Sequence, residues 1–160
     1  MSFRETLPSD RQTHELLAEY FSSRELGFTG EHGYTIVFPH DEQFVPPHGV
    51  FLVVENDGAG VGSGGVGCGG IRMIEPGTEG AVRFEVKHVW VDPLARGAGL
   101  GRRILAELER RAIEFGASEA VLDTNASLEA AAGLYRSSGY HEVAPYNDNP
   151  NATNWYAKAL

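Results

Sequence analysis

The sequence predicts an α/β domain in which helices flank a mixed β-sheet of about six or seven strands. Its 160 residues, 42% of them hydrophobic, suffice for one domain with a buried core. Strand-like and helix-like segments alternate only in the second half, so both parallel and antiparallel strand pairs are expected. Because no linker or internal repeat interrupts the chain, residues 1–160 are expected to form a single domain.

The first half predicts one helix followed by two strands. Apolar residues recur at helical spacing over residues 9–28, and either Ser9 or Asp10 can cap that helix. Residues 49–57 predict a strand, since they are rich in β-branched and aromatic residues and end in an Asn-Asp-Gly turn signal. The glycine-rich residues 61–74 predict a second strand.

The middle of the chain predicts a central strand and a long helix. Residues 81–91 carry apolar side chains on both faces, as a strand in the middle of a sheet does. Residues 100–115 follow as a helix with an apolar stripe, on which Glu107 and Arg111 pair at i,i+4 on the solvent side. Gly116 is placed to end this helix in the left-handed conformation.

The remaining segments predict a strand, a short helix and two more strands. Residues 119–125 predict the strand. Ser127 is placed to cap a helix over residues 128–138, which Gly139 ends. The last two strands are expected at residues 141–146 and 154–160.

Charge and cysteine content narrow the classes of partner. The net charge of −9 argues against nucleic acid or an anionic membrane and is compatible with a cationic amine substrate. No stretch is long and apolar enough to span a membrane, and the first residues do not form a signal peptide. The single cysteine, Cys68, is expected to be a small buried strand residue, and a cytoplasmic, reducing location is the simplest interpretation.

Three glycines and several arginines lie where the central strand gives way to the long helix. Gly97, Gly99 and Gly101 occupy alternate positions between Arg96 and Arg102. Glycines there let the backbone turn tightly, and the first N–H groups of a helix lack internal partners. Together with the guanidinium groups they can bind phosphate oxygens, although a glycine-rich segment can also be only a turn.

Two common nucleotide motifs do not fit this loop. A P-loop requires Lys followed by Ser or Thr after its last glycine, whereas Gly101 is followed by Arg102 and Arg103. A dinucleotide fingerprint is spaced G-x-G-x-x-G, with an acid about twenty residues later. Asp123 stands roughly at that acid, but the glycines are spaced G-x-G-x-G.

The segment VDPLARGAGLGRRIL resembles the acetyl-CoA loop of the GNAT N-acetyltransferase superfamily, whose form is R/Q-x-x-G-x-G/A, with Arg96, Gly99 and Gly101 in matching positions. The segment AAGLYRSSGYHEV is similar to the helix that ends in Leu-Tyr-x-x-x-Gly-Tyr/Phe in that family. VGCGGIR and the last fifteen residues also resemble family members, so that the resemblance covers most of the chain from Phe51 onward.

The resemblance implies a sheet splayed in the middle, with the pantetheine arm of acetyl-CoA between residues 84–91 and 119–125. It implies acetyl-CoA as acyl donor, and no metal is expected. The arm would hydrogen-bond the backbone of Val89, Trp90 and Val91 as a pseudo-strand, while the Trp90 side chain is expected in the core. The pyrophosphate would be held by the N–H groups of Arg96, Gly97, Ala98, Gly99, Leu100, Gly101 and Arg102.

Two side chains match catalytic positions of the family. Glu85 matches its frequent acidic base, but could instead be a structural ion-pair partner of Lys87, two residues along on the same face; a water chain is the other route for the proton. Tyr135 matches its proton donor to the CoA thiolate, though Tyr135 also continues an apolar helical stripe. A backbone N–H near Val89 could stabilise the oxyanion.

One position departs from the family pattern. Many members carry Asn seven residues before the tyrosine, in contact with the CoA arm, and here that residue is Leu128. Asn125 either replaces this contact or helps to cap the following helix.

Other polar residues are expected to have ordinary roles. His88 is placed on the strand face opposite Glu85, and none of the six histidines is expected to bind a metal. Asp41, Glu42 and Asp148 would flank the acceptor site, where they could attract an amine or simply be solvated.

The resemblance implies an N-acetyltransferase in which a primary amine attacks acetyl-CoA directly in a ternary complex. The lone cysteine does not indicate a covalent acetyl-enzyme. The rival classes are a non-catalytic acyl-CoA sensor and a nucleotide-binding protein. A small-molecule or peptide amine remains open as acceptor, with selectivity expected in residues 29–49 and 146–153. Many relatives pair, so a homodimer is a further possibility.

Overall fold

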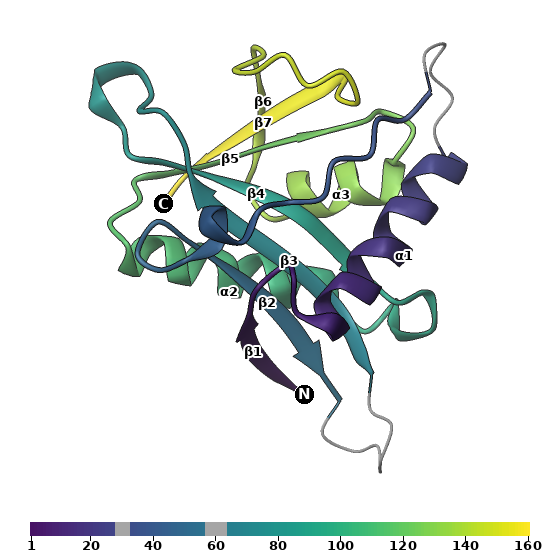
Figure 1. Ribbon diagram of the computed structural model, residues 1–160. Helices are drawn as coiled ribbons and strands as arrows, with labels where there is room; N and C mark the ends of the chain where they lie inside the picture. The colour runs from purple at the N-terminus through teal and green to yellow at the C-terminus, as the bar shows by residue number, and fades with distance from the viewer. Residues whose placement is uncertain (28–32, 57–63) are drawn as a thin grey trace.

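The computed structural model describes residues 1–27, 33–56 and 64–160 (Figure 1). Its strands are β1 (Ser2–Thr6), β2 (Gly49–Glu55), β3 (Gly65–Met73), β4 (Arg83–Val91), β5 (Glu119–Thr124), β6 (His141–Val143) and β7 (Asn154–Ala159). Its α-helices are α1 (Arg11–Gly27), α2 (Leu100–Glu114) and α3 (Glu129–Ser137). Single 3-10 turns occupy Asp41–Phe44, Thr78–Gly80 and Pro93–Ala95.

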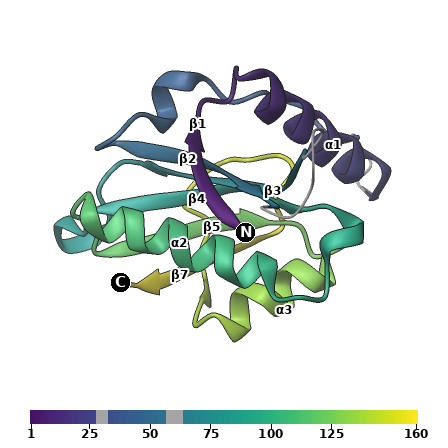
Figure 2. The same ribbon diagram turned by 90° about the horizontal axis from the view of Figure 1, so that it is seen from below.

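Within these described residues, seven strands form one sheet in the order β1-β2-β3-β4-β5-β7-β6. The pair β4 and β5 is parallel, and the other neighbours are antiparallel. Helix α1 covers one face of the sheet, and α2 and α3 cover the other (Figure 2). The predicted mixed α/β architecture is therefore confirmed, including the central place of β4.

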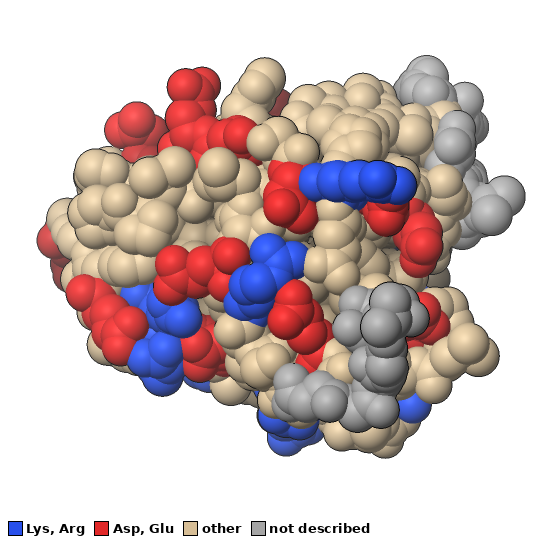
Figure 3. Space-filling model, turned by 60° about the horizontal axis from the view of Figure 1, so that its bottom comes forward, with Lys and Arg blue, Asp and Glu red and all other residues tan. Residues whose placement is uncertain are grey.

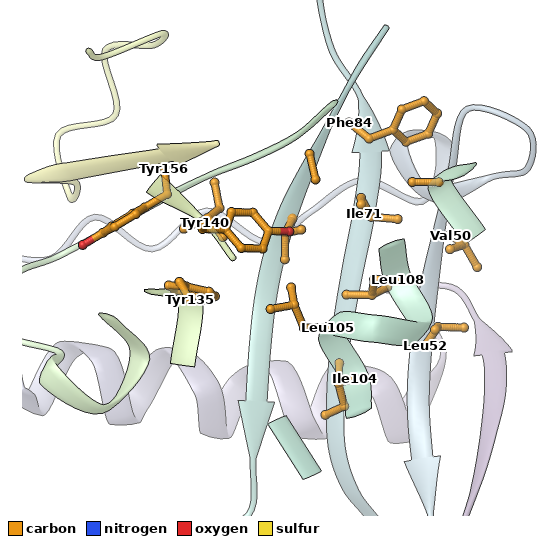
Figure 4. Close-up of a cluster of buried hydrophobic side chains, with 14 of the residues drawn as sticks. Val50, Leu52, Ile71, Phe84, Ile104, Leu105, Leu108, Tyr135, Tyr140 and Tyr156 are labelled. Carbon is orange, nitrogen blue, oxygen red and sulfur yellow. The ribbon is translucent and has the colours of Figure 1, made fainter. Parts of the chain in front are cut away.

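The larger hydrophobic cluster lies between the sheet and α2 (Figure 4). Leu105 and Leu108 of α2 are almost fully buried against the sheet, as the apolar stripe predicts. On β4, Phe84 and Val86 point into this cluster. Three tyrosines extend this cluster toward α3 and β7 (Figure 4), namely Tyr135, Tyr140 and Tyr156.

The smaller hydrophobic cluster lies on the opposite face, under α1. Leu17, Phe51 and Cys68 are fully buried there, and the Trp90 side chain joins them, as expected for a core aromatic. Burial raises the pKa of the Cys68 thiol to about 12, so this cysteine is protonated at neutral pH.

Several local predictions are confirmed by the backbone. Asp10 caps α1, since its carboxylate accepts from the N–H groups of Gln12 and Thr13. Gly116 and Gly139 follow α2 and α3 with φ values of +94° and +93°. The carboxylate of Glu107 lies 2.9 Å from Nε of Arg111.

Two other local predictions are wrong or incomplete. Ser127 does not cap α3, because the residue before that helix is Leu128 and no side chain there accepts a backbone hydrogen bond. The sequence interpretation also missed β1, which adds an edge strand by antiparallel pairing with β2. The end of the predicted first helix at Phe28, most of the Asn-Asp-Gly turn and residues 61–63 of the second strand lie outside the described residues.

Among the helices of the described residues, none has the length and apolar character needed to cross a membrane.

Candidate functional site

The sheet opens between β4 and β5. Their parallel ladder has only three Cα pairs and ends where Glu85 lies opposite Val121. Beyond that point β4 continues to Val91 and β5 to Thr124 without pairing with each other. Figure 1 shows these two strands diverging. Backbone groups on that side of β4 therefore lack strand partners and can pair with an extended ligand.

A β-bulge at His88 reshapes the same part of β4. The ladder with β3 shifts register between Cys68 and Gly70, and His88 has a φ of +56°. The extra residue resets the alternation of side chains, so His88 lies on the same face as Glu85 and Lys87. The prediction that His88 lies opposite Glu85 is therefore wrong. Its ring instead contacts Tyr20 and Phe21 of α1.

Glu85 lies at the point where the strands separate and is 2% exposed. One carboxylate oxygen accepts two hydrogen bonds from Arg72, at 2.8 and 3.1 Å, and lies 3.5 Å from Nζ of Lys87. The other accepts from the Tyr146 hydroxyl at 2.9 Å and from the Asn147 amide at 3.3 Å. The predicted ion pair with Lys87 is thus present, and Arg72 is a second cationic partner.

Asp123 of β5 closes the network across the divergence. Both of its oxygens lie 3.1 Å from Nζ of Lys87, and one accepts from the Asn147 amide at 2.7 Å. Burial opposes ionisation of Asp123, but Lys87 and the amide donors outweigh it and hold its pKa below the ordinary value. Trp155 donates to the Asn147 carbonyl at 2.8 Å and fixes the orientation of that amide.

A cavity of about 270 Å³ lies where the strands diverge. α1 and residues 34–40 supply aromatic side chains to its wall, including Tyr20 and Phe38. Lys87, His88 and Asp123 line it from the sheet, whereas Glu85 lies behind these residues and does not line it.

Tyr135 of α3 lines the same cavity and is 6% exposed. Its ring packs at 6.1 Å from that of Tyr140 and 6.2 Å from that of Tyr156 (Figure 4). Burial raises the pKa of its hydroxyl to about 12, and this hydroxyl has no hydrogen-bond partner in the described part of the chain. It is therefore a neutral O–H group available to a ligand.

The three glycines in the loop after β4 and at the start of α2 are required for different structural reasons. Gly97 and Gly99 have φ values of +86° and +73°, in the left-handed region that favours glycine. A Cβ on Gly101 would come within 3.2 Å of Leu134, so this glycine lets α2 approach α3. The exposed backbone before Leu100 thus ends at the N-terminus of a 15-residue helix.

The arginines beside this loop also have internal contacts. Nε of Arg96 donates to the Val91 carbonyl at 3.0 Å, and Arg102 donates to the Ser137 hydroxyl at 3.0 Å. Both arginines are exposed.

Asn125 connects the end of β5 to two loops. Its carbonyl accepts from the Ser127 amide at 2.9 Å and its amide donates to the Asn151 carbonyl at 3.1 Å. Asn151 in turn exchanges two hydrogen bonds with the backbone of Thr35. A chain of hydrogen bonds therefore joins the segments on both sides of the cavity mouth.

The sequence comparison with known families identifies this fold. The model of the acetyltransferase (GNAT) family matches residues 11–140. The chain belongs to the GNAT family. An uncharacterized N-acetyltransferase of Schizosaccharomyces pombe is 29% identical over 90% of this chain and 84% of its own length. N-acetyl transfer is the activity that this family and its members indicate.

Two solved GNAT-like structures share the fold along nearly the whole chain. A putative acyl-CoA N-acyltransferase from Klebsiella pneumoniae has a TM-score of 0.73 and 26% identity, covering 99% of this chain and 97% of its own. The NatC complex bound to Gag peptide and CoA contains a chain with a TM-score of 0.68, covering 100% and 99%. At 17% identity, that second likeness shows the fold alone.

The sequence interpretation missed most of the residues around Glu85. Arg72, Tyr146 and Asn147 come from β3 and from the segment before β7, so no local pattern brings them together. Among the described residues, no group of three or more His, Cys, Asp or Glu side chains could hold a metal ion.

Asp41, one of the acids expected beside the acceptor site, accepts two hydrogen bonds from Ser9.

Acidic and basic side chains alternate on the face drawn in Figure 3, rather than forming a field of one sign.

Proposed function

We propose that this GNAT protein transfers an acetyl group from acetyl-CoA to a primary amine by direct attack in a ternary complex. The observation that carries the proposal is that β4 and β5 separate after Glu85 directly into a cavity that Tyr135 lines. Val89, Trp90 and Val91 belong to the part of β4 that is not paired with β5, and they lead from this cavity to the glycine loop.

The residues present fit each part of the donor. The backbone of Val89 to Val91, on the side that β5 has left, would bind the pantetheine arm as an added strand. The amides from Arg96 to Arg102 would bind the pyrophosphate at the start of α2. Asn125 is held by Ser127 and Asn151, so its side chain would contribute little to the cofactor beyond shaping the wall.

Acetyl-CoA supplies a thioester as the acyl donor. The amine nitrogen attacks the carbonyl carbon, the carbon–sulfur bond breaks, and Tyr135 gives its proton to the leaving thiolate. We assign removal of the amine proton to water in the cavity. Glu85 does not line the cavity, and its oxygens already contact Arg72, Lys87 and Tyr146. Glu85 is thus a positioning residue in this proposal.

The test is release of free thiol from acetyl-CoA in the presence of an amine panel. Tyr135→Phe is expected to lower kcat about 100-fold or more, since general acids contribute effects of that order. Tyr140→Phe is the matched control, because this neighbouring tyrosine does not line the cavity and should retain activity. Tight CoA binding without turnover on any amine would instead indicate an acyl-CoA sensor.

A further inference from the structure

The charge of the cavity wall is opposite to that of the whole chain. The protein has a net charge of −9. Yet three cations line the cavity, namely Arg24, Arg72 and Lys87, and among the described residues one acid, Asp123, does. A second acid, Glu85, lies directly behind the wall. Among the described residues, the cations therefore outnumber the nearby carboxylates at the place where the acceptor would bind.

Two of these cations, Lys87 and Arg72, already contact carboxylates, and Arg72 uses only part of its guanidinium to do so. Nζ of Lys87 contacts both Asp123 and Glu85. Arg72 uses Nε and Nη2 on a single oxygen of Glu85, so the Nη1 edge of its guanidinium has no hydrogen-bond partner among the described residues. The Arg72 side chain is 27% exposed, and it borders the cavity.

Arg24 is the third cation that lines the cavity, and neither Glu85 nor Asp123 forms an ion pair with it. Its guanidinium carbon lies 5.0 Å from the centre of the Tyr20 ring, near the end of α1. No carboxylate in the described part of the chain forms an ion pair with it. A partly buried guanidinium without a counter-ion is unfavourable, and an anion that enters the cavity would relieve this. Arg24 lines the cavity, and the planar fork of donors on a guanidinium matches the geometry of a carboxylate.

We propose that the acceptor amine carries a carboxylate or a similar anion, as amino acids do, and that Arg24 and the free edge of Arg72 bind it. This inference rests on the proposed transferase activity and names its substrate class. The aromatic side chains of Tyr20, Phe21 and Phe38 on the same wall would contact an apolar part of the acceptor. The attacking nitrogen would then point toward Tyr135.

The test compares matched acceptors by thiol release. Leucine, methionine and phenylalanine are each measured beside their primary amides and their decarboxylated amines. The carboxylate member of each series is expected to have the highest kcat/KM, by about 10- to 100-fold, the range that hydrogen bonds to a charged group typically provide. The amide lowers the basicity of the neighbouring amine, so a preference for the acid over its amide cannot arise from a larger neutral fraction. The decarboxylated amine is more basic than the acid, so that comparison uses kcat/KM values calculated on the neutral amine present at the assay pH.

Arg24→Gln should remove most of this preference, so that the ratio of kcat/KM for each acid to kcat/KM for its decarboxylated amine falls toward one, with an unchanged KM for acetyl-CoA. Arg11→Gln is the matched control, because Arg11 lies on the same helix with a side chain 93% exposed and outside the cavity. It should alter neither acceptor preference nor rate.

Three outcomes would overturn the inference. The first is equal or better turnover of the amides and decarboxylated amines. The second is turnover confined to amines without an anion or to peptide N-termini with the carboxylate far away. The third is an Arg24→Gln effect on the KM of acetyl-CoA alone, which would assign the arginine to the cofactor. Each leaves the transferase proposal standing, whereas absence of turnover with every amine would refute that proposal itself.

Discussion

The two faces of β4 show how one strand serves both the fold and the site. Phe84 and Val86 point to the α2 side and are covered by apolar neighbours. Glu85, Lys87 and His88 point to the α1 side, where they contact β3, β5 and α1 and the segment before β7. The apolar face requires only buried area, whereas the polar face requires specific partners.

This difference has a consequence for substitution. Loss of apolar volume under α2 should lower stability without changing the chemistry, because Leu105 and Leu108 do not line the cavity, although Val86 and Tyr135 of the same cluster do. Changes on the polar face should affect the cavity wall as well as stability, because the network fixes the strands where they diverge.

Leu108→Ala is expected to lower the free energy of unfolding by about 2–5 kcal/mol, since Leu108 is fully buried and its loss leaves a cavity. Urea unfolding measures the effect. The KM values for both substrates should stay unchanged at a temperature where the variant is folded. Ile113→Ala on the exposed side of α2, where the residue is 53% exposed, should change stability by less than about 0.5 kcal/mol. A change in KM for Leu108→Ala would contradict the separation of the two faces.

Glu85→Gln is expected to lower the free energy of unfolding by about 2–3 kcal/mol, because it leaves Arg72 and Lys87 with one counter-ion fewer. As a positioning residue, Glu85 should affect kcat less than about tenfold, and the rise of kcat/KM with pH should persist as the acceptor amine loses its proton.

The matched control is Glu55→Gln, which removes a half-exposed ion pair with Arg4 and should cost less than about 1 kcal/mol. If Glu85→Gln instead lowers kcat by about 100-fold or more and abolishes the pH-dependent rise, Glu85 is the catalytic base.

Gly69 and Gly70 are adjacent on β3 and face opposite sides, so they compare the two faces directly. A Cβ on Gly70 would overlap Phe44 and approach Phe51 to 2.7 Å, whereas one on Gly69 would lie 3.0 Å from Ile104. Gly70→Ala should therefore destabilise the protein by about 1–3 kcal/mol and Gly69→Ala by less than about 1 kcal/mol. Thermal and urea unfolding check the order, and a larger loss at Gly69 would show that the α1 side repacks more easily.

Most of the fold could be predicted from the sequence because it depends on local patterns. Apolar periodicity located α2, and Gly116 marked its end. β1 was missed because the segment SFRET has one large apolar residue, Phe3, and becomes a strand only by pairing with β2. Whether these five residues form a strand depends on their pairing with β2, which their own sequence does not show.

The candidate site was predictable where its signal is contiguous. The glycine loop and Tyr135 lie in short motifs, and the structure places both beside the split strand. The partners of Glu85 could not be inferred beyond Lys87, because Arg72 and Tyr146 are brought together only by the sheet. The position of His88 was predicted wrongly because strict alternation along the strand was assumed. The bulge adds one residue, which moves the His88 side chain to the other face.

His88 offers the smallest test, through the pH dependence of stability. Burial lowers the pKa of its imidazole to about 3, with Lys87 and Arg72 adding to the effect, and its Nδ1 atom is buried without a partner in the described part of the chain. Well above pH 6.5 the ring is neutral in both the folded and unfolded states and contributes nothing to the pH dependence. Between pH 6.5 and pH 3 the unfolded chain binds a proton that the folded protein does not, so stability falls as the pH falls.

The expected slope is about 0.5–1 kcal/mol per pH unit, below the limit for one full proton because His88 is partly open to the cavity. Urea unfolding between pH 7.5 and pH 5 measures it. His88→Asn keeps a residue that tolerates a positive φ, and should flatten this part of the profile even though it is less stable at pH 7.5. His48→Asn, at an exposed histidine, should leave the profile unchanged. An unaltered slope in His88→Asn would show that the imidazole on the polar face of β4 accepts a proton as readily folded as unfolded, and that this face is more open to water than its contacts with Tyr20 and Phe21 indicate.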